Sequence, residues 1–331
     1  MSSRKILSVI VPSYNVEKFL TKTLDSMCCI SNITDLEILV VNDGSKDSTI
    51  ELANKYKSSY PESIIVIDKE NGGHGSTINA GIKAATGKYF KVIDGDDWVD
   101  SEQFEIFVEK LKQAEADLIL SPFRKVYEDV GEREEIRPSI VIDDGVHQFN
   151  KLIDNLKDFY CMHAITFKTS IYKKVPFQIT EHCFYVDMEF ILYPVDYITS
   201  VQYLDQCVYQ YRLGRPGQSV SMESKIKNKD MHKKVIIEIV KHCLECRDKT
   251  HNVDISNYLY YKVVTLINIQ YSIYLSMTPS REVYRELKDF KKTIGSSIPQ
   301  GYWQGISRII SIIPASYWII GYRYRKVYVD N

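Results

Sequence analysis

The sequence predicts an α/β fold in which a mostly parallel β-sheet carries helices on its faces. Through the first 120 residues, apolar runs of strand length alternate with segments of helical spacing. The runs are apolar almost throughout, which is typical of strands that are covered on both faces. After about residue 221 only helical patterns remain, so we expect a helical region to follow the sheet domain.

Five apolar runs predict the strands of the first 120 residues. None is longer than six residues, and a turn-forming or polar residue follows each of them. The runs are Ile6–Val11, Ile38–Val41, Ile64–Ile67, Phe90–Ile93 and Leu118–Leu120.

Between these runs, apolar residues recur at the spacing of one helix face. Asn15 precedes the first of these segments, and Ser45 or Asp47 precedes the second; such side chains commonly cap helix N-termini. After Asp100 the apolar residues follow an i, i+3, i+4, i+7 pattern. The apolar positions are Leu20, Leu24 and Met27; Ile50, Ala53 and Tyr56; Ile78, Ile82 and Ala85; and Phe104, Phe107, Val108 and Leu111.

The middle of the chain, from about 122 to 220, has a mixed pattern. The charged stretch from Glu128 to Arg137 predicts an exposed loop or hairpin, while Ile140–Ile142 and Val201–Tyr211 predict further strands. A long helix is expected over Ile255 to Met277. The resulting division has three parts: a sheet domain over 1–220, a helical extension over 221–300 and a terminal segment over 301–331.

Charge and cysteine content exclude several classes of protein. The chain has 42 Lys and Arg residues against 43 Asp and Glu residues, so it is not a globally basic nucleic-acid-binding protein. No window of about 18 residues is apolar and uncharged, so we expect no helix that spans a bilayer. Seven cysteines, with Cys28 and Cys29 adjacent, do not suit a secreted disulfide framework, which favours the cytoplasm.

The terminal segment has the composition of a membrane-surface element. Between Arg308 and Arg323 lie 14 uncharged residues, too few to span a bilayer but enough to lie in its interface. Aromatic residues flank this stretch, and four cations face the single anion Asp330. Such a segment suits anionic lipid, which predicts a peripheral position on the inner face of the cell membrane. The alternative is a helix packed on its own domain.

Polar groups follow the first four predicted strands, at the edge where parallel sheets bind their ligands. The segments are Pro12–Asn15, Asn42–Ser45, Asp68 and Asp94–Asp97. A single acidic strand end could be a helix cap, but three acidic ends among four predict a polar, anionic cleft.

Asp94 and Asp96 are the most informative pair in that cleft. In extended backbone, residues i and i+2 point the same way, so both carboxylates can reach one point, and Gly95 between them permits close approach. Two like charges this close repel unless a cation or a proton lies with them, and oxygen ligands favour Mg²⁺ or Mn²⁺ held together with a diphosphate. The sequence has no P-loop, so ATPase chemistry is disfavoured.

Several sequence blocks, taken in order, resemble the family-2 inverting glycosyltransferases of the GT-A fold, of the type that builds bacterial surface polysaccharides. The resemblance is strong over about 5–100 and looser to about 220. It divides the sheet domain into a nucleotide-binding part over 1–120 and an acceptor part over 121–220. The blocks are Ser8–Asn15, Val41–Thr49, Asn71-Gly72-Gly73, Asn79–Gly87 and Asp94–Trp98.

The resemblance implies roles for the residues of the cleft. Pro12, Tyr14 and Asn15 would line the pocket for the nucleotide base and ribose, and Asp43 would accept a hydrogen bond from a uracil ring. Asp94 would bind the ribose or sugar and share the metal, and Gly95 would allow the donor to approach. Asp96 would be the principal metal ligand, and Asp97 would share that role or support it.

Further roles fall after residue 160. The resemblance implies a catalytic base that opens a helix, which matches Asp187, with Glu189 as the fallback; an acid at a helix N-terminus favoured by the dipole is the alternative. Arg212, in a segment that resembles the family's closing loop, would clamp the diphosphate, unless it belongs to a plain basic loop. His163 is either an acceptor-side polar residue or a satisfied buried histidine.

The implied reaction moves a hexosyl or N-acetylhexosaminyl group from a nucleotide-sugar donor, most simply a UDP-sugar, to a glycan hydroxyl with the help of Mn²⁺ or Mg²⁺. A membrane-surface tail suggests a lipid-linked acceptor. One alternative is a nucleotidyltransferase, but the Gly-rich basic loop expected after its first strand is missing. Another is a non-catalytic nucleotide-sugar-binding protein, which the intact pair of Asp94 and Asp96 argues against.

Overall fold

The computed structural model describes residues 5–156, 158–214, 221–249, 252–295 and 297–298. The chain divides into two compact units. The first contains residues up to His182 together with Glu189–Arg215, and the second contains Cys183–Met188 and the residues from Pro216 onward. The predicted membrane segment over 301–331 lies outside the described residues, so its contact with lipid stays a prediction.

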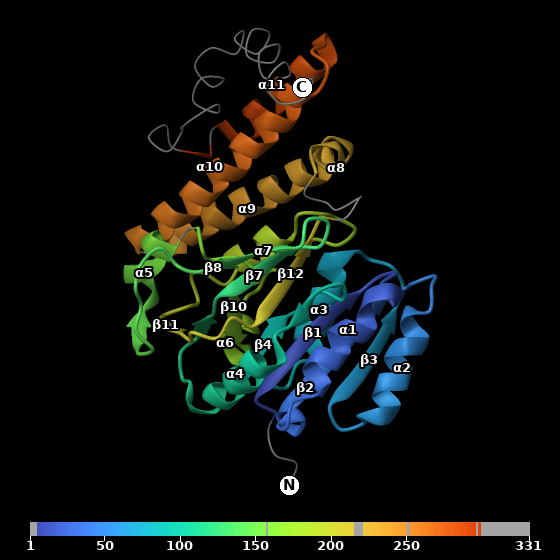
Figure 1. The fold of residues 1–331 in the computed structure, drawn as a ribbon. Helices are drawn as coiled ribbons and strands as arrows, with labels where there is room; N and C mark the ends of the chain where they lie inside the picture. The colour runs from blue at the N-terminus through green and yellow to red at the C-terminus, as the bar shows by residue number, and fades with distance from the viewer. Residues whose placement is uncertain (1–4, 157, 215–220, 250–251, 296, 299–331) are drawn as a thin grey trace. The chain divides into compact units, whose positions relative to one another are not determined.

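The first unit is built on an eight-stranded mixed sheet, which confirms the predicted α/β class (Figure 1). The strand order is β3-β2-β1-β4-β10-β6-β11-β9, and the first four of these strands are parallel to one another. The strands are β1 (Leu7–Ser13), β2 (Leu36–Asp43), β3 (Ile64–Lys69), β4 (Tyr89–Val92), β6 (Leu118–Leu120), β9 (Val146–Gln148), β10 (Ile165–Lys168) and β11 (Ser200–Tyr203).

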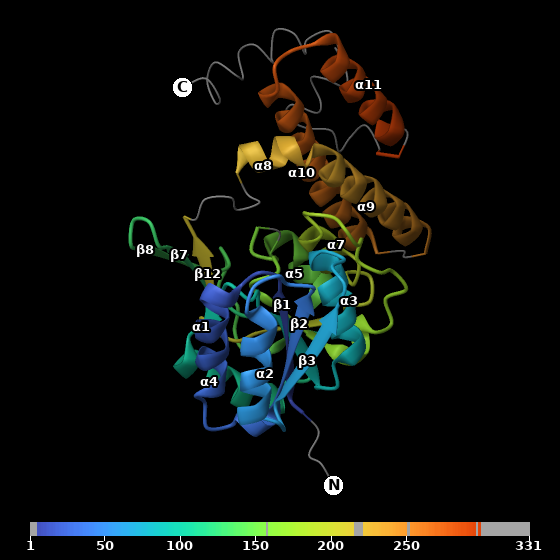
Figure 2. The ribbon, with the colours of Figure 1, turned by 90° about the vertical axis from the view of Figure 1, so that its right-hand side faces the viewer.

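Helices cover both faces of the parallel part of this sheet. Every residue of β1 and β2 is buried, as their apolar sequences require. Figure 2 shows α1 and α2 on one face of β1–β3 and α3 on the other, because the chain reverses its direction across the sheet after β3. The helices of this region are α1 (Glu17–Cys28), α2 (Thr49–Ser59), α3 (His74–Ala84), α4 (Ser101–Gln113), α5 (Phe149–Leu156), α6 (Thr169–Tyr172) and α7 (Asp187–Leu192), with the 3₁₀ turn η1 (Ile33–Asp35).

A second, four-stranded sheet has the order β5-β12-β7-β8. Its outer pair is the hairpin predicted around Glu128 to Arg137. The prediction of a strand at Ile140–Ile142 is wrong, because these residues form no strand and Val141 is fully exposed. Three consecutive apolar residues without a buried face are not enough to form a strand. The strands are β5 (Trp98–Val99), β7 (Phe123–Tyr127), β8 (Glu132–Ile136) and β12 (Tyr209–Leu213).

The described part of the second unit is mainly helical, in accord with the predicted pattern. The apolar face expected in α10 is buried, and His232 of α9 lies 2.7 Å from the amide oxygen of Gln270 in α10. None of the described helices is long and apolar enough to cross a bilayer. All seven cysteines of the chain are free thiols. The main helices of this unit are α8 (Met222–Lys227), α9 (Lys229–Lys249), α10 (Val253–Ser276) and α11 (Arg281–Gly295).

Close packing of α3 on β1 sets where α3 begins. Gly81 of α3 faces β1, and a Cβ atom there would lie only 2.4 Å from Cγ2 of Ile10. Glycine therefore lets the helix backbone approach the strand, and the N-terminal residue of α3, His74, lies at the carboxyl edge of the sheet.

A buried lysine fills the gap where β4 and β10 separate. Their pairing ends at Phe90 and Phe167. Beyond that point the Lys91 ammonium donates to the carbonyl oxygens of His163 at 2.8 Å and Ile165 at 3.0 Å. These two bonds take the place of sheet hydrogen bonds and fix the chain just before β10.

We expect Gly81→Ala to lower the free energy of unfolding by about 1–3 kcal/mol, because overpacking against Ile10 outweighs the gain in helix propensity of about 1 kcal/mol. Gly295→Ala is the matched control, since a Cβ atom at that helical position meets nothing within 4 Å. Urea unfolding at pH 7 measures both variants. Equal stability of wild type and Gly81→Ala would contradict the close approach.

Burial lowers the pKa of the Lys91 amine to about 7, against an opposing effect of Cys161. Between pH 7 and 10 the unfolded chain keeps this proton while the folded protein loses it. The free energy of unfolding therefore rises with pH through this group, by at most about 1.4 kcal/mol per unit. We expect the free energy of unfolding of the wild type, minus that of Lys91→Met, to increase from pH 7 to pH 10. Urea unfolding at each pH measures both proteins.

The control for this measurement is Lys55→Met, which removes an exposed amine from α2. A pH dependence shared by both variants would come from the loss of a lysine charge in general and not from the burial of Lys91. A flat difference for Lys91→Met would show that the Lys91 amine keeps its proton in the folded protein.

Candidate functional site

Polar residues gather where β1, β2 and β4 end. Asp43 is the last residue of β2, and the segment Asp94–Asp97, here called the acidic turn, follows β4. The backbone N–H of Gly95 donates to the carbonyl oxygen of Pro12 at 3.0 Å, which joins the acidic turn to the end of β1. The structure thus brings together most of the predicted cleft residues from different parts of the chain.

The acidic turn is not an extension of β4, as the sequence argument assumed. The N–H of Asp97 donates to the carbonyl oxygen of Asp94 at 2.9 Å, which closes a β-turn. Gly95 is required inside it because a Cβ atom would lie 2.8 Å from the Pro12 oxygen and 2.9 Å from Oγ of Ser13. The close approach made possible by Gly95 in this structure is therefore to the backbone of β1.

Asp97 is the buried anchor of the acidic turn. Its two carboxylate oxygens accept hydrogen bonds from the hydroxyl of Tyr209 at 2.6 Å and from the N–H of Arg212 at 2.8 Å. Burial, followed by the charges of Asp96 and Asp94, holds the pKa of Asp97 well above its usual value, although both hydrogen bonds act in the opposite direction. Asp97 therefore has a supporting position and not an exposed one.

Asp94 is half-buried and paired with a histidine. Its Oδ1 lies 2.9 Å from Nε2 of His74, and its backbone N–H donates to the Tyr209 hydroxyl at 3.2 Å. Burial would raise the pKa of Asp94, but the charge and hydrogen bond of His74, with His163 and Tyr209 contributing, lower it below the usual value. Asp94 is therefore a carboxylate at neutral pH.

The acidic turn has the donor set that a divalent cation requires. Asp94 and Asp96 are both partly exposed, and the negative charge of each raises the pKa of Asp97. Carboxylate oxygens in such a cluster are ligands of the kind that Mg²⁺ and Mn²⁺ prefer. The residues present thus fit the predicted metal.

Arg212 has a different setting from the phosphate clamp that the sequence predicts. Its Nε donates to the carbonyl oxygen of Asp96 at 2.6 Å, and its Nη1 pairs with Glu128. The guanidinium also lies over the rings of Phe19 and Trp98, at 4.8 and 4.7 Å from their centroids. Because these contacts leave the residue only 5% exposed, its visible role is to hold the acidic turn in place.

The residues predicted to surround the nucleotide base lie at the end of β1. Pro12 is buried, whereas Tyr14 is 50% exposed and Asn15 is exposed with a φ of 53°. Asn15 does not cap α1, because its Oδ1 accepts the N–H of Lys46 at 2.8 Å in the loop after β2. At α2 the N-cap residue is Ser48, which makes no side-chain cap, but of the two predicted candidates Asp47 does bond the start of the helix: its Oδ1 accepts the N–H of Thr49 at 3.1 Å.

Asp43 organises the glycine-rich loop that starts α3. Its Oδ1 accepts hydrogen bonds from the Lys69 ammonium and the N–H of Gly72, both at 2.9 Å, and its Oδ2 accepts from the N–H of Gly73 at 2.8 Å. Asp43 is only 2% exposed. Its predicted contact with a uracil ring stays a prediction, and its visible effect is to present His74 to Asp94.

Two residues of this site were not found from the sequence. His74 follows a glycine-rich stretch that was a weak signal by itself, although its position after the third strand places it at the ligand-binding edge. Tyr209 lies 112 residues from Asp97, and no local pattern indicates a contact over that separation.

The two predicted base residues have different environments. Asp187 is exposed, is the first residue of α7 and belongs to the second unit. Glu189 is fully buried in the first unit, where its carboxylate accepts both the N–H and the hydroxyl of Thr180, at 2.7 and 2.8 Å, and the hydroxyl of Tyr193 at 3.1 Å. Glu189 is thus occupied with holding α7 against the preceding loop.

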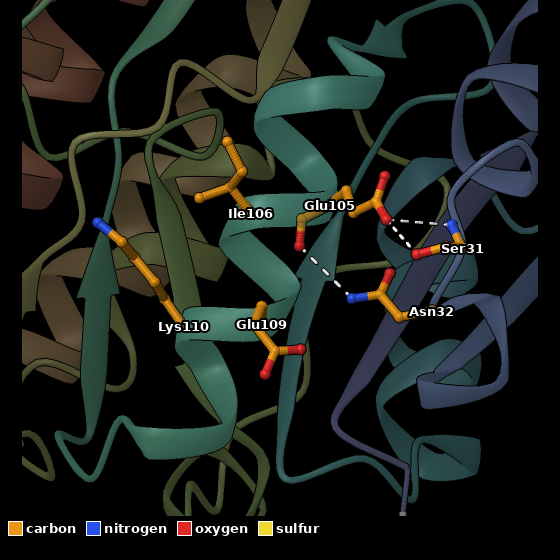
Figure 3. Close-up of a pocket in the computed structure, with 6 residues that line it drawn as sticks. All are labelled: Ser31, Asn32, Glu105, Ile106, Glu109 and Lys110. Carbon is orange, nitrogen blue, oxygen red and sulfur yellow. Dashed lines mark hydrogen bonds between the residues drawn. The ribbon is translucent and has the colours of Figure 1, made fainter.

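Two hollows in the first unit lie apart from the acidic turn. One, of about 410 Å³, is formed near the amino end of β2, where Glu105 of α4 hydrogen-bonds Ser31 and Asn32. The side chains of Ile106 and Lys110, which also line it, point away from these two residues (Figure 3). The other, of about 580 Å³, lies between α3 and the segment 172–181. Neither is lined by a predicted site residue.

The fold and this edge of the sheet identify the class of protein. Residues 8–178, more than half of the chain, match Glycosyl transferase family 2. The chain therefore belongs to glycosyl transferase family 2.

Curated relatives match a little over a third of the chain. It is 40% identical over 124 residues to the uncharacterized glycosyltransferase EpsJ of Bacillus subtilis (strain 168), which covers 38% of this chain and 36% of that protein. It is 33% identical over 126 residues to a poly(ribitol-phosphate) beta-glucosyltransferase of Bacillus spizizenii, over 36% of this chain and 19% of that protein. The matched region is thus well under half of either relative.

Solved structures match nearly the whole chain in fold. TarS 1–349 of S. aureus in complex with UDP-GlcNAc superposes with a TM-score of 0.70 at 18% identity, covering 98% of this chain and 91% of that one. A mannosyltransferase of Pyrobaculum calidifontis in complex with GDP-Man and Mn²⁺ gives a TM-score of 0.51 at 13% identity, covering 100% and 89%. The TarS match confirms the predicted GT-A fold.

Proposed function

We propose that this chain transfers a sugar from a nucleoside diphosphate donor, most simply a UDP-sugar, to a hydroxyl of a cell-surface glycan. The observation that carries the proposal is the acidic turn, which presents Asp94 and Asp96 at the carboxyl edge of a family-2 sheet. Family membership supports the reaction class, and the acidic turn supplies the chemistry that a diphosphate leaving group needs.

In this proposal the nucleoside of the donor binds at the end of β1. Tyr14 is exposed there beside Asn15, so an aromatic ring and an amide are available to a nucleoside. Structures of TarS have been solved with UDP-GlcNAc and with UDP, which supports a UDP-sugar as the first donor to test.

Asp94 and Asp96 would hold Mn²⁺ or Mg²⁺. When bound, such an ion neutralises charge on the departing diphosphate. The chain's own part is to keep Asp94 ionised and both ligands in place. His74 lowers the pKa of Asp94, and the bonds that Tyr209 and Arg212 make to Asp97 fix the end of the acidic turn.

Asp187 removes the proton of the acceptor hydroxyl as that oxygen attacks the anomeric carbon from the face opposite the diphosphate. This single displacement inverts the anomeric carbon without a covalent intermediate. Exposure at the start of a helix leaves the Asp187 carboxylate accessible to an acceptor, whereas Glu189 is buried and hydrogen-bonded. These environments support Asp187 over Glu189 as the base.

The acceptor proposed here is a glycan, lipid-linked in the simplest case. The relatives include proteins described as a poly(ribitol-phosphate) beta-glucosyltransferase and a minor teichoic acid biosynthesis protein, which supports a surface-polymer setting. A peripheral position at the cytoplasmic membrane depends on residues 301–331 and stays a prediction.

The first test is a screen of nucleotide sugars with and without Mn²⁺. We expect turnover of a UDP-sugar that EDTA abolishes, and a fall in kcat/KM of at least about 100-fold in Asp96→Asn, because several kcal/mol of charge stabilisation is lost. Glu109→Gln, in the hollow of Figure 3, is the control for removing a carboxylate and should match wild type. Pyrophosphate release from a nucleoside triphosphate and a sugar phosphate, without sugar transfer, would identify a nucleotidyltransferase instead.

The base is tested by a pair of variants. Asp187→Asn should lower kcat by about 10²–10⁴-fold with UDP affinity unchanged, because general-base catalysis is lost. Glu189→Gln should cost about 1–3 kcal/mol of stability, because a buried acceptor is replaced, yet its folded fraction should transfer sugar. Full activity in Asp187→Asn, together with an inactive but stable Glu189→Gln, would reverse the assignment.

A further inference from the structure

His163 lies in a box of aromatic rings just before β10. Its imidazole stacks on the ring of Tyr211 with centroids 4.1 Å apart, meets the ring of Tyr209 edge-on at 4.8 Å, and lies 5.2 Å from the ring of Phe123. Its carbonyl oxygen accepts the hydrogen bond from Lys91. Three aromatic rings therefore contact the side chain, and the bond from Lys91 holds the backbone. Together these contacts restrict the orientation of the imidazole.

The ring nitrogens of His163 have spare hydrogen-bonding capacity. The residue is half-buried, and among the described residues the only polar contact of its ring is the Cys161 sulfur, 4.0 Å from Nδ1. A thiol at that distance is a weak partner. The imidazole is therefore largely covered but not satisfied by hydrogen bonds within the described residues, and a fixed polar group with unused capacity is suited to a ligand.

Tyr209 connects His163 to the acidic turn. The same tyrosine ring that His163 meets edge-on carries the hydroxyl that bonds Asp97 at 2.6 Å and lies 3.5 Å from Oδ2 of Asp94. In the sheet, β10 neighbours β4 on the side opposite β1 and β2. His163 thus lies beside the reaction centre, across Asp94 from the strand ends assigned to the nucleotide.

The charge state of His163 narrows the class of ligand. Burial lowers the pKa of the imidazole to about 4; the charge of Asp94 acts to raise it, and Lys91 and Lys125 act to lower it. At neutral pH the ring is uncharged, with one N–H donor and one acceptor nitrogen. Such a ring has no charge to attract phosphate or carboxylate, whereas a hydroxyl, which both donates and accepts, matches it.

We propose that His163 is a substrate-binding residue that hydrogen-bonds a saccharide hydroxyl at the reaction centre, on the side away from the nucleotide. This assignment rests on the proposed function. The hydroxyl belongs either to the sugar being transferred or to the acceptor, and the experiment below distinguishes these two sources.

The test compares His163→Phe, which keeps a flat ring in the aromatic box but has no nitrogen, with His163→Gln, which keeps an amide that can donate and accept. Three quantities are measured for each full-length protein: affinity for UDP, hydrolysis of the UDP-sugar without acceptor, and transfer to acceptor. We expect UDP affinity within about twofold of wild type, a fall in kcat/KM for transfer of about 10- to 100-fold in His163→Phe, and a smaller fall in His163→Gln.

The hydrolysis arm identifies the hydroxyl. A parallel fall in hydrolysis places it on the transferred sugar, while unchanged hydrolysis with impaired transfer places it on the acceptor. The control is His147→Gln, which alters a histidine paired with Asp143 on the surface strand β9 and should match wild type.

Wild-type transfer rates in His163→Phe would overturn the proposal. So would a loss of UDP affinity equal to the loss of activity, because that pattern belongs to a ring needed only for packing. If wild type itself turns over no nucleotide sugar, the proposed function fails, and this result is distinct from active wild type with an equally active His163→Phe. Should His163→Phe fold poorly, His163→Leu, which also has no polar side-chain atom, takes its place in the same comparison with His163→Gln.

Discussion

The site depends on how the protein buries the carboxyl group of Asp97. A buried carboxylate is tolerated only when its oxygens receive hydrogen bonds, and here β12 supplies both of them, one from the Tyr209 hydroxyl and one from the Arg212 backbone. The same two residues also bond Asp94 and Asp96, through the Asp94 N–H and the Asp96 carbonyl oxygen. One buried acid thus fixes the geometry of its two more exposed neighbours.

A second buried acid does comparable work at the end of β2, which is separated from β4 by β1. Asp43 receives the N–H groups of Gly72 and Gly73, and that bonding shapes the loop from which His74 reaches Asp94. Asp97 is the residue directly after Asp96, and Asp43 acts through the loop that carries His74. Both acids therefore support the more exposed residues of the site from one residue or one loop away. The edge of the sheet therefore consists of a layer of buried, hydrogen-bonded carboxyl groups beneath a layer of partly exposed ones.

Much of the fold could be predicted from the sequence because the parallel strands are buried on both faces, so their apolar runs stand out along the chain. The strands β1 to β4 and β6 begin and end within two residues of the expected runs. The apolar positions expected on the helices lie within α1 to α4, except Ala85, which directly follows α3. The short run Ile140–Ile142 misled because three apolar residues do not define a buried face.

The sequence predicted which residues belong to the site better than it predicted how they are arranged. Asp94 and Asp96 were expected to point together along an extended strand, but the N–H of Asp97 closes a turn there instead. The settings of Tyr209, Arg212 and Glu189 arise from tertiary contacts, and those of Tyr209 and Arg212 span more than a hundred residues. Sequence patterns describe local periodicity, so contacts of that length have no signature in them.

The long separation between Asp97 and Tyr209 has a consequence for how the protein is made. On the ribosome, the strands β1 to β4 can pair as soon as they emerge, but the acidic turn has no partner for its buried carboxyl group until β12 has followed. A nascent chain shorter than about residue 212 therefore has most of its sheet and no ordered acidic turn. Assembly of the acidic turn is one of the last steps in folding the first unit, and it waits for the same strand that borders His163.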